Sequence, residues 1–254
     1  MAQLGASTGW GLVVAASLVA GAVLAAVADL PPRVAATVTA FGGGTLLAAI
    51  ALQLVPAADR SAGPWLTGAG LLAGTLAYVG ADAWLTRDKG KEVRRRMGHA
   101  MVAGREMPMP ERAKAAEGEV VAAGIFVDGV PESVALGLTI AGGGVGVALL
   151  AGVLLGNVVE AYGSAHLMVA GGRRGRYAVT LLTAIGMALA LATVLGGTLL
   201  VHASPRIIGT AQAVSAGAVL AVVSIAIIPH SFSEVSRRVA SATVLGFIGG
   251  YLLS

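Results

Sequence analysis

Long apolar runs alternate with short polar stretches along almost the whole chain. A helix of about 20 apolar residues crosses the hydrocarbon core of a bilayer. Runs of roughly this length, with a shorter last one, lie at 9–28, 34–55, 64–85, 119–140, 145–170, 177–200, 207–228 and 239–253. The pattern therefore predicts an all-α polytopic membrane protein with eight transmembrane helices. We interpret the first run as a span rather than a signal peptide, because it has no basic leader and no convincing cleavage site.

One long polar stretch, at 86–118, interrupts this pattern after the third predicted span. We expect it to be a cytoplasmic loop within a single transmembrane domain that covers residues 1–254. Its Arg94, Arg95 and Arg96 could contact anionic membrane lipid. The simpler interpretation is solvated charge on the cytoplasmic side.

The composition favours a membrane protein, and the charges indicate its orientation. Of the 254 residues, 56% are hydrophobic and only 12% are charged, a balance that water-soluble domains do not have. If both termini lie outside, all Lys and Arg except Arg60 and Arg206 fall inside, as the positive-inside rule requires. The net charge of +4 then indicates topology rather than nucleic-acid binding, and we expect a bacterial inner (cytoplasmic) membrane protein. Cysteine is absent, which excludes disulfides and thiolate metal sites.

An internal echo links the second predicted span to the seventh. The same spacing of Gly, Leu and Pro occurs in both, at Gly44, Leu47, Pro56 and at Gly217, Leu220, Pro229. Under the topology above these two spans run in opposite directions, so the echo predicts an inverted repeat. Chance similarity between Gly- and Ala-rich helices is the alternative.

Three acidic residues lie inside two neighbouring apolar runs, where a charged side chain costs roughly 3 kcal/mol. Asp128 and Glu132 stand one helical turn apart on one face. Asn157 and Glu160 share a face of the next span, and the short connection at 141–146 makes the two spans antiparallel neighbours. We therefore expect these four side chains to converge at mid-membrane and to bind a cation or relay a proton. The alternative is a neutral, hydrogen-bonded cluster that only joins helices.

Other residues could contribute to an ion pathway. Pro131 lacks an N–H, so it should kink its helix and free a backbone carbonyl near Val127 to line a cavity. The accessory pathway positions are Gln53, Ser164, His230 and Glu234. A helix-to-helix hydrogen bond is the alternative for Gln53, and an ordinary solvated pair is the alternative for His230 and Glu234.

The two acidic motifs resemble those of the ZIP (Zrt/Irt-like) family of metal transporters. The chain reads DGVPES at 128–133 and GNVVEA at 156–161, where this family typically has His-Asn-Xaa-Pro-Glu-Gly and His-Xaa-Xaa-Pro-Glu-Gly. The glycines at 42–44, Pro56 and Pro229 are also similar to the family's second and seventh spans. The resemblance implies an eight-helix fold in a 3+2+3 arrangement, with a variable cytoplasmic loop between the third and fourth spans.

The departures from the family motifs bear on the metal. Asp128 and Gly156 replace both family histidines, and Val159 replaces the second proline. The donors that remain are carboxylates and one amide, which suit Mn²⁺, Fe²⁺ or Mg²⁺, while Zn²⁺ still accepts oxygen ligands. The metal-binding candidates are Asp128, Glu132, Asn157 and Glu160.

We therefore expect a transporter that moves divalent cations of the Zn²⁺/Mn²⁺/Fe²⁺ class into the cytoplasm by alternating access. The cation is the substrate, and no cofactor is expected. An enzyme is not expected, because the Gly-Xaa-Gly-Asp signature of intramembrane aspartyl proteases is missing. The alternative is a ZIP-fold protein that has lost transport and acts as a binding or structural membrane protein. Small-residue helix faces would permit a homodimer without specifying one.

Overall fold

The computed structural model describes residues 2–85, 111–144, 146–199 and 203–254. The secondary structure of this described part is entirely helical, which confirms the all-α part of the predicted fold class. Its elements, in chain order, are α1 (Ala2–Val27), α2 (Pro32–Ala49), the π-helical turn η1 (Ile50–Leu54), α3 (Val55–Ala62), α4 (Pro64–Leu85), α6 (Glu111–Ala141), α7 (Val147–Ala170), α8 (Gly175–Thr198), α9 (Pro205–Val222), the π-helical turn η2 (Val223–Ile227), α10 (Ile228–Val235) and α11 (Arg238–Leu253).

Six helices in the described part are long and apolar enough to cross a membrane. They are Leu4–Val27, Arg33–Ala62, Lys114–Ala141, Val147–Ala170, Gly175–Thr198 and Pro205–Ile227. Each coincides with a predicted span, and α4 and α11 occupy the positions of the other two. Length and composition thus indicate an integral membrane protein.

The polar stretch between α4 and α6 was predicted as loop over 86–118. Residues 86–110 lie outside the described part of the chain. The remaining residues are helical, because α6 already begins at Glu111, so this end of the predicted loop is wrong. Nothing in 111–118 breaks a helix: the stretch carries no proline, and only Gly118 has a low helix propensity.

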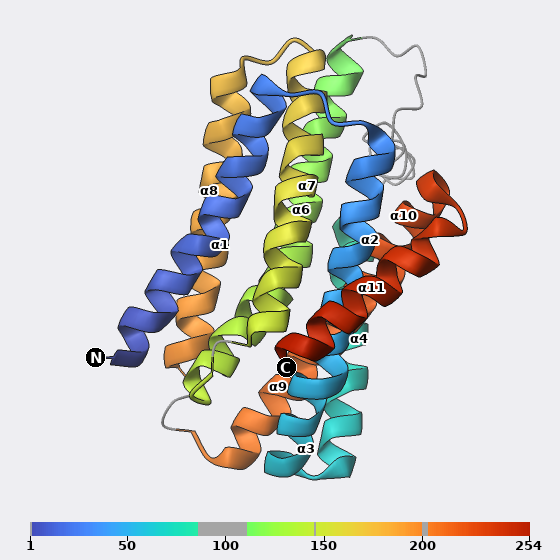
Figure 1. Cartoon of the computed structure of the whole chain (residues 1–254). Helices are drawn as coiled ribbons and strands as arrows, with labels where there is room; N and C mark the ends of the chain where they lie inside the picture. The colour runs from blue at the N-terminus through green and yellow to red at the C-terminus, as the bar shows by residue number, and fades with distance from the viewer. Residues whose placement is uncertain (1, 86–110, 145, 200–202) are drawn as a thin grey trace.

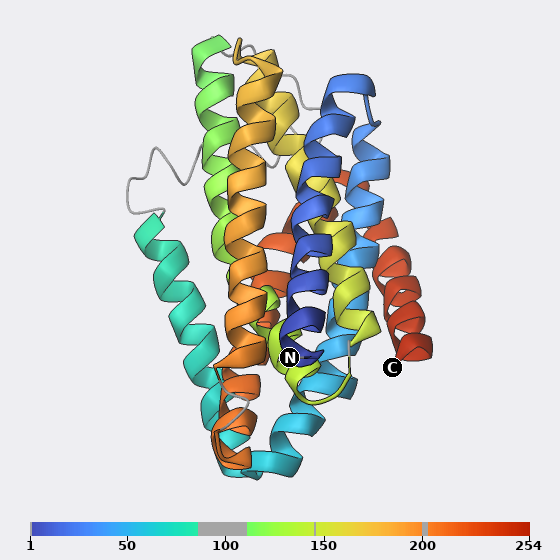
Figure 2. The same cartoon turned by 90° about the vertical axis from the view of Figure 1, so that its left-hand side faces the viewer.

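The helices form an elongated bundle of roughly parallel rods (Figures 1 and 2). α1 packs along α8, α2 along α11, and α4 along α9, while α6 and α7 pack on each other. Both chain ends lie in the lower half of Figure 1. The core consists of side chains with almost no exposed surface, among them Leu18, Leu46, Leu136, Leu149 and Leu182.

Two segments, 32–62 and 205–235, have the same sequence of elements. Each contains an 18-residue helix, a 5-residue π-helical turn and an 8-residue helix. The two segments run in opposite directions (Figure 1). Pro56 and Pro229 follow the turns and cannot donate a backbone hydrogen bond to the carbonyl four residues earlier. Each π-helical turn therefore lies where an α-helical hydrogen bond is missing.

Small residues allow the helices to approach closely at the same point of both segments. A Cβ added at Gly44 of α2 would overlap the backbone carbonyl of Thr243 on α11. A Cβ added at Gly217 of α9 would overlap the backbone of Leu71 on α4. The repeated Gly-Leu-Pro spacing thus includes the glycine at which α2 contacts α11 and the glycine at which α9 contacts α4.

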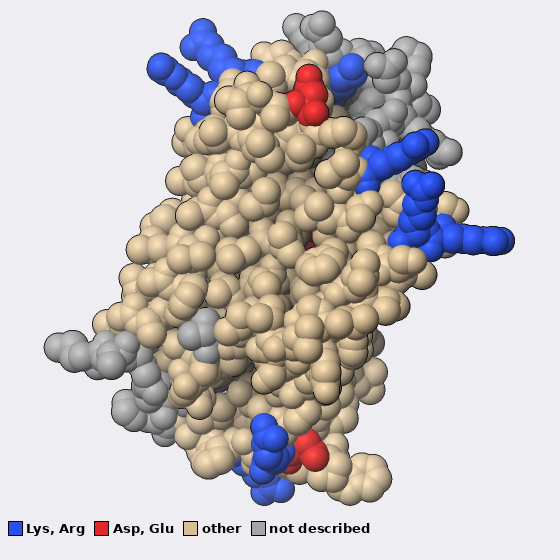
Figure 3. Space-filling model, viewed as in Figure 1, with Lys and Arg blue, Asp and Glu red and all other residues tan. Residues whose placement is uncertain are grey.

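The charged side chains on the visible face avoid the lower middle of the bundle. Lys and Arg gather in the upper part and at the lower end, with an uncharged band between them (Figure 3). In the upper part, Arg173 forms an ion pair with Glu119 of α6, with 2.7 Å between guanidinium nitrogen and carboxylate oxygen. The uncharged band is what a bilayer core requires of a surface that faces lipid.

Candidate functional site

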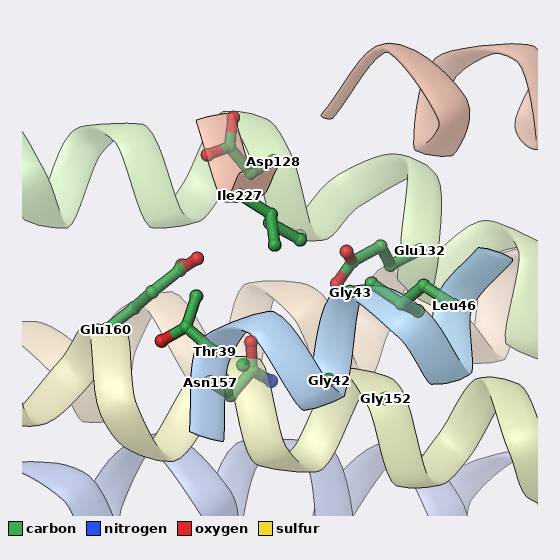
Figure 4. Close-up of a pocket in the computed structure, with 12 residues that line it drawn as sticks. Thr39, Gly42, Gly43, Leu46, Asp128, Glu132, Gly152, Asn157, Glu160 and Ile227 are labelled. Atoms are coloured by element: carbon green, nitrogen blue, oxygen red, sulfur yellow. The ribbon is translucent and has the colours of Figure 1, made fainter. Parts of the chain in front are cut away.

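The four predicted metal ligands line one pocket. α2, α6 and α7 contribute most of its wall, and η2 contributes Ile227 (Figure 4). The full lining is Thr39, Gly42, Gly43 and Leu46 from α2, Asp128, Gly129 and Glu132 from α6, Gly152, Gly156, Asn157 and Glu160 from α7, and Ile227. The two acidic motifs therefore border the same pocket, and the binding of a cation there stays a prediction.

The pocket is small. Its free volume is about 10 Å³, close to the roughly 10–15 Å³ that one water molecule needs. Five of its lining residues are glycines that bring backbone, rather than side chains, to the wall. Such a space holds a single water or a single bare ion.

The acidic side chains of this pocket are largely shielded from solvent. Asp128 and Glu132 are 5% and 6% exposed, and Glu160 is half-buried. Asn157 and Glu160 lie near the middle of the 24-residue α7. Carboxylates at such a position need a cation, a proton or a strong hydrogen-bond donor to offset the loss of water.

One such donor was not predicted. The buried hydroxyl of Tyr78 on α4 donates a hydrogen bond to Asp128 Oδ1 over 2.6 Å. Tyr78 is 3% exposed and belongs to the hydrophobic core. The sequence signal was weak: a tyrosine in an apolar span, one helical turn before Asp82.

Asn157 carries an unsatisfied polar group. Its Nδ2 atom is buried and has no hydrogen-bond partner among the described residues. A buried polar group in this state costs about 1–3 kcal/mol. A half-turn about the last side-chain bond exchanges the positions of the amide oxygen and nitrogen, so a rotated amide would present its oxygen where Nδ2 now lies. The Asn157 side chain can therefore either donate a hydrogen bond through Nδ2 or offer its amide oxygen to a cation.

The carboxylates line the pocket without closing on one point. Among the described residues, no group of three or more His, Cys, Asp or Glu is close enough to hold a metal ion. In the view of Figure 4, the Ile227 side chain projects between the Glu160 and Glu132 carboxyl groups. The four predicted ligands thus share a pocket, but their present positions do not form a complete coordination shell.

The accessory residues lie elsewhere. Gln53 belongs to η1, and its buried Oε1 has no hydrogen-bond partner in the described structure. Ser164 donates a hydrogen bond of 2.8 Å to the carbonyl of Gly118, which joins α7 to α6. Neither residue lines the pocket. The Ser164 hydroxyl thus joins two helices in the structure, and the pathway roles of Gln53 and Ser164 stay predictions.

Three further predictions remain open. His230 and Glu234 are on α10, but their side chains lie outside the described part of the structure. Pro131 is inside α6, which continues as a helix to Ala141. The kink at Pro131 and the free backbone carbonyl near Val127 therefore stay predictions.

No protein-family model matches the chain, and no curated protein matches it. The chemistry must therefore be argued from the pocket. Oxygen donors of three carboxylates and one amide are the ligands of hard and borderline divalent cations. Besides these four residues the lining holds Thr39, whose hydroxyl donates a hydrogen bond to the carbonyl of Ala35, together with glycines and aliphatic side chains.

Proposed function

We propose that this protein is a membrane transporter that moves divalent metal cations of the Zn²⁺/Mn²⁺/Fe²⁺ class into the cytoplasm through this pocket. The observation that carries the proposal is the meeting of three carboxylates and an amide in one ion-sized space between α2, α6 and α7. A purely structural cluster would satisfy its polar groups. Asn157 Nδ2 instead remains without a partner in the described structure.

The proposed architecture is eight transmembrane helices in a 3+2+3 arrangement with an inverted repeat, as in ZIP transporters. The matching segments 32–62 and 205–235, which run in opposite directions, support this assignment. So do the rods α4 and α11, which stand where the two remaining spans are expected. Both termini would lie outside, and the end of the bundle that carries Arg173 would face the cytoplasm.

Transport in this scheme begins with a cation drawing the carboxylates together. Glu132 and Glu160 are the proposed shared ligands, with Asp128 and Asn157 completing the shell. Because no three acidic groups are close enough to hold a metal ion in the described structure, binding requires these side chains to move toward one another. When the cation leaves, a carboxylate can take up a proton, so a metal or proton gradient could drive the cycle.

Uptake into proteoliposomes tests this function directly. Purified protein should accumulate at least one of Zn²⁺, Mn²⁺ and Fe²⁺ above protein-free vesicles, with Mg²⁺ and Cd²⁺ measured in the same screen. Equilibrium binding of the same cations should be measured in detergent in parallel. Binding without uptake would contradict transport and favour the alternative of a binding protein. Absence of both would leave a structural role.

Replacing Asp128 by His should shift the preference from Mn²⁺ toward Zn²⁺, because imidazole nitrogen is a softer donor than a carboxylate oxygen. We expect the Zn²⁺/Mn²⁺ selectivity ratio to rise by about tenfold, measured by competition in the uptake assay. Asp59→His, at an exposed position of α3, is the matched control. Equal ratios in both variants would show that Asp128 does not contact the cation.

A further inference from the structure

α4 is fixed mainly to α9. Gly74 of α4 and Gly217 of α9 leave no space for a Cβ against the opposite helix backbone. The Thr75 hydroxyl also donates a hydrogen bond of 3.0 Å to the carbonyl of Gly217. These contacts join α4 and α9 into one packed pair.

α6 is fixed mainly to α7 and α8. Ser164 of α7 donates to the carbonyl of Gly118 near the start of α6. At the other end, a Cβ at Gly137 would overlap the carbonyl of Thr193 on α8. α6 therefore packs mainly on α7 and α8, contacts α9 less, and approaches α4 over only a short length.

The hydrogen bond between Tyr78 and Asp128 crosses from one of these groups to the other. It joins two buried side chains over 2.6 Å. A hydroxyl bonded to a carboxylate is a strong, charge-assisted interaction, and low local polarity strengthens it further. The bond also holds Oδ1 of Asp128, one of the pocket carboxylates, toward α4.

The second segment of the chain offers a comparison. Tyr251 occupies on α11 the position that corresponds to Tyr78 on α4, because both follow the matched elements at the same spacing. Tyr251 is 61% exposed. The same residue type is thus buried and bonded to an acid in one half and faces outward in the other.

We propose that Tyr78 is a positioning residue of the cation pocket: its hydrogen bond holds Asp128 toward α4 and keeps α6 latched to α4 until a cation draws Asp128 away. This inference rests on the proposed function for the identity of the trigger. It accounts for the finding that no three acids of the described residues are close enough to hold a metal ion, because a carboxylate held by α4 does not close on the two glutamates. Release of the bond would let α6 and α7 move past α4 and α9.

The first test compares Tyr78→Phe with Tyr251→Phe, which removes the same hydroxyl from the matching position. Tyr78→Phe should bind Mn²⁺ about tenfold more tightly in detergent, because Asp128 no longer has to leave a partner. In uptake, both KM and the maximal rate should fall, since a tightly bound ion is released slowly. Tyr251→Phe should match the unaltered protein. Weaker or unchanged Mn²⁺ binding by Tyr78→Phe would overturn the proposal.

The second test measures the latch without any cation. The chain has no cysteine, so Gly80→Cys on α4 and Phe126→Cys on α6, both at exposed positions, can carry a spin-label pair. Tyr78→Phe should broaden the distance distribution between the labels, and Tyr251→Phe should not. Asp128→Ala removes the same bond from its other end and should broaden it equally.

These readouts separate the two proposals. An unchanged label distance in Tyr78→Phe and Asp128→Ala would overturn the latch, whatever the uptake assay gives. If the unaltered protein binds no cation, the proposed function falls, and the label distances still decide whether Tyr78 joins α4 to α6.

Discussion

Replacing Glu160 by Gln is expected to abolish cation uptake while the protein still folds and inserts. Gln keeps the size of the side chain but removes one full negative charge from the pocket. Loss of an outer hydrogen-bond partner of a ligand already costs about 10–100-fold in metal affinity, so loss of the ligand charge should cost at least about 100-fold. Initial uptake rates in proteoliposomes, with reconstituted protein quantified, measure the effect.

Glu119→Gln is the matched control for this experiment. Glu119 is also an acid on an apolar helix, but it pairs with Arg173 in the upper part of the bundle and lies outside the pocket. Its ion pair is partly exposed and should contribute little to stability. We expect uptake by Glu119→Gln to remain within error of the unaltered protein. Unchanged uptake kinetics in Glu160→Gln would remove the pocket from the mechanism.

Gly44→Ala and Gly217→Ala are expected to destabilise the protein by similar amounts. In each case the new methyl group would overlap backbone atoms of the neighbouring helix, which cannot move aside as a flexible side chain can. Overpacking of this kind costs about 1–3 kcal/mol. Because the two glycines occupy matching positions of the repeated segments, their losses should agree more closely with each other than with other variants. Thermal unfolding in detergent measures them.

Gly68→Ala and Gly80→Ala serve as controls on α4. A Cβ at either position meets no atom within 4 Å, and alanine has the higher helix propensity. Both variants should unfold at or above the midpoint of the unaltered protein. If Gly44→Ala or Gly217→Ala behaved like these controls, the close contacts of α2 with α11 and of α9 with α4 would be wrong.

The helices were predictable because length and hydrophobicity alone specify them. Each of the eight apolar runs became a helical rod, and the element bounds differ from the predicted ones by a few residues at most ends. The π-helical turns η1 and η2 were not predicted, although Pro56 and Pro229 were visible. A missing hydrogen bond at proline can be absorbed by a kink, a bulge or a break, and sequence does not choose among them.

The pocket was predictable only in its three acids and Asn157. Asp128, Glu132 and Glu160 attract notice because apolar runs exclude charge. Tyr78 has no such signal, since a tyrosine also suits a hydrophobic core. The hydrogen bond of Ser164 to Gly118 was not predictable, because the face of a helix that meets a given neighbour depends on packing, and here Gly118 leaves room for α7 to approach α6.

The free volume of about 10 Å³ has a consequence for the cargo. An ion that enters so small a space would have to shed nearly all its coordinated water and accept protein oxygens instead. Mg²⁺ dehydrates reluctantly and usually keeps several waters, so the energetic barrier to its passage would be the highest. The cost of dehydration would then exclude Mg²⁺ on the outer side of the membrane, while transition metals that shed water more readily pass.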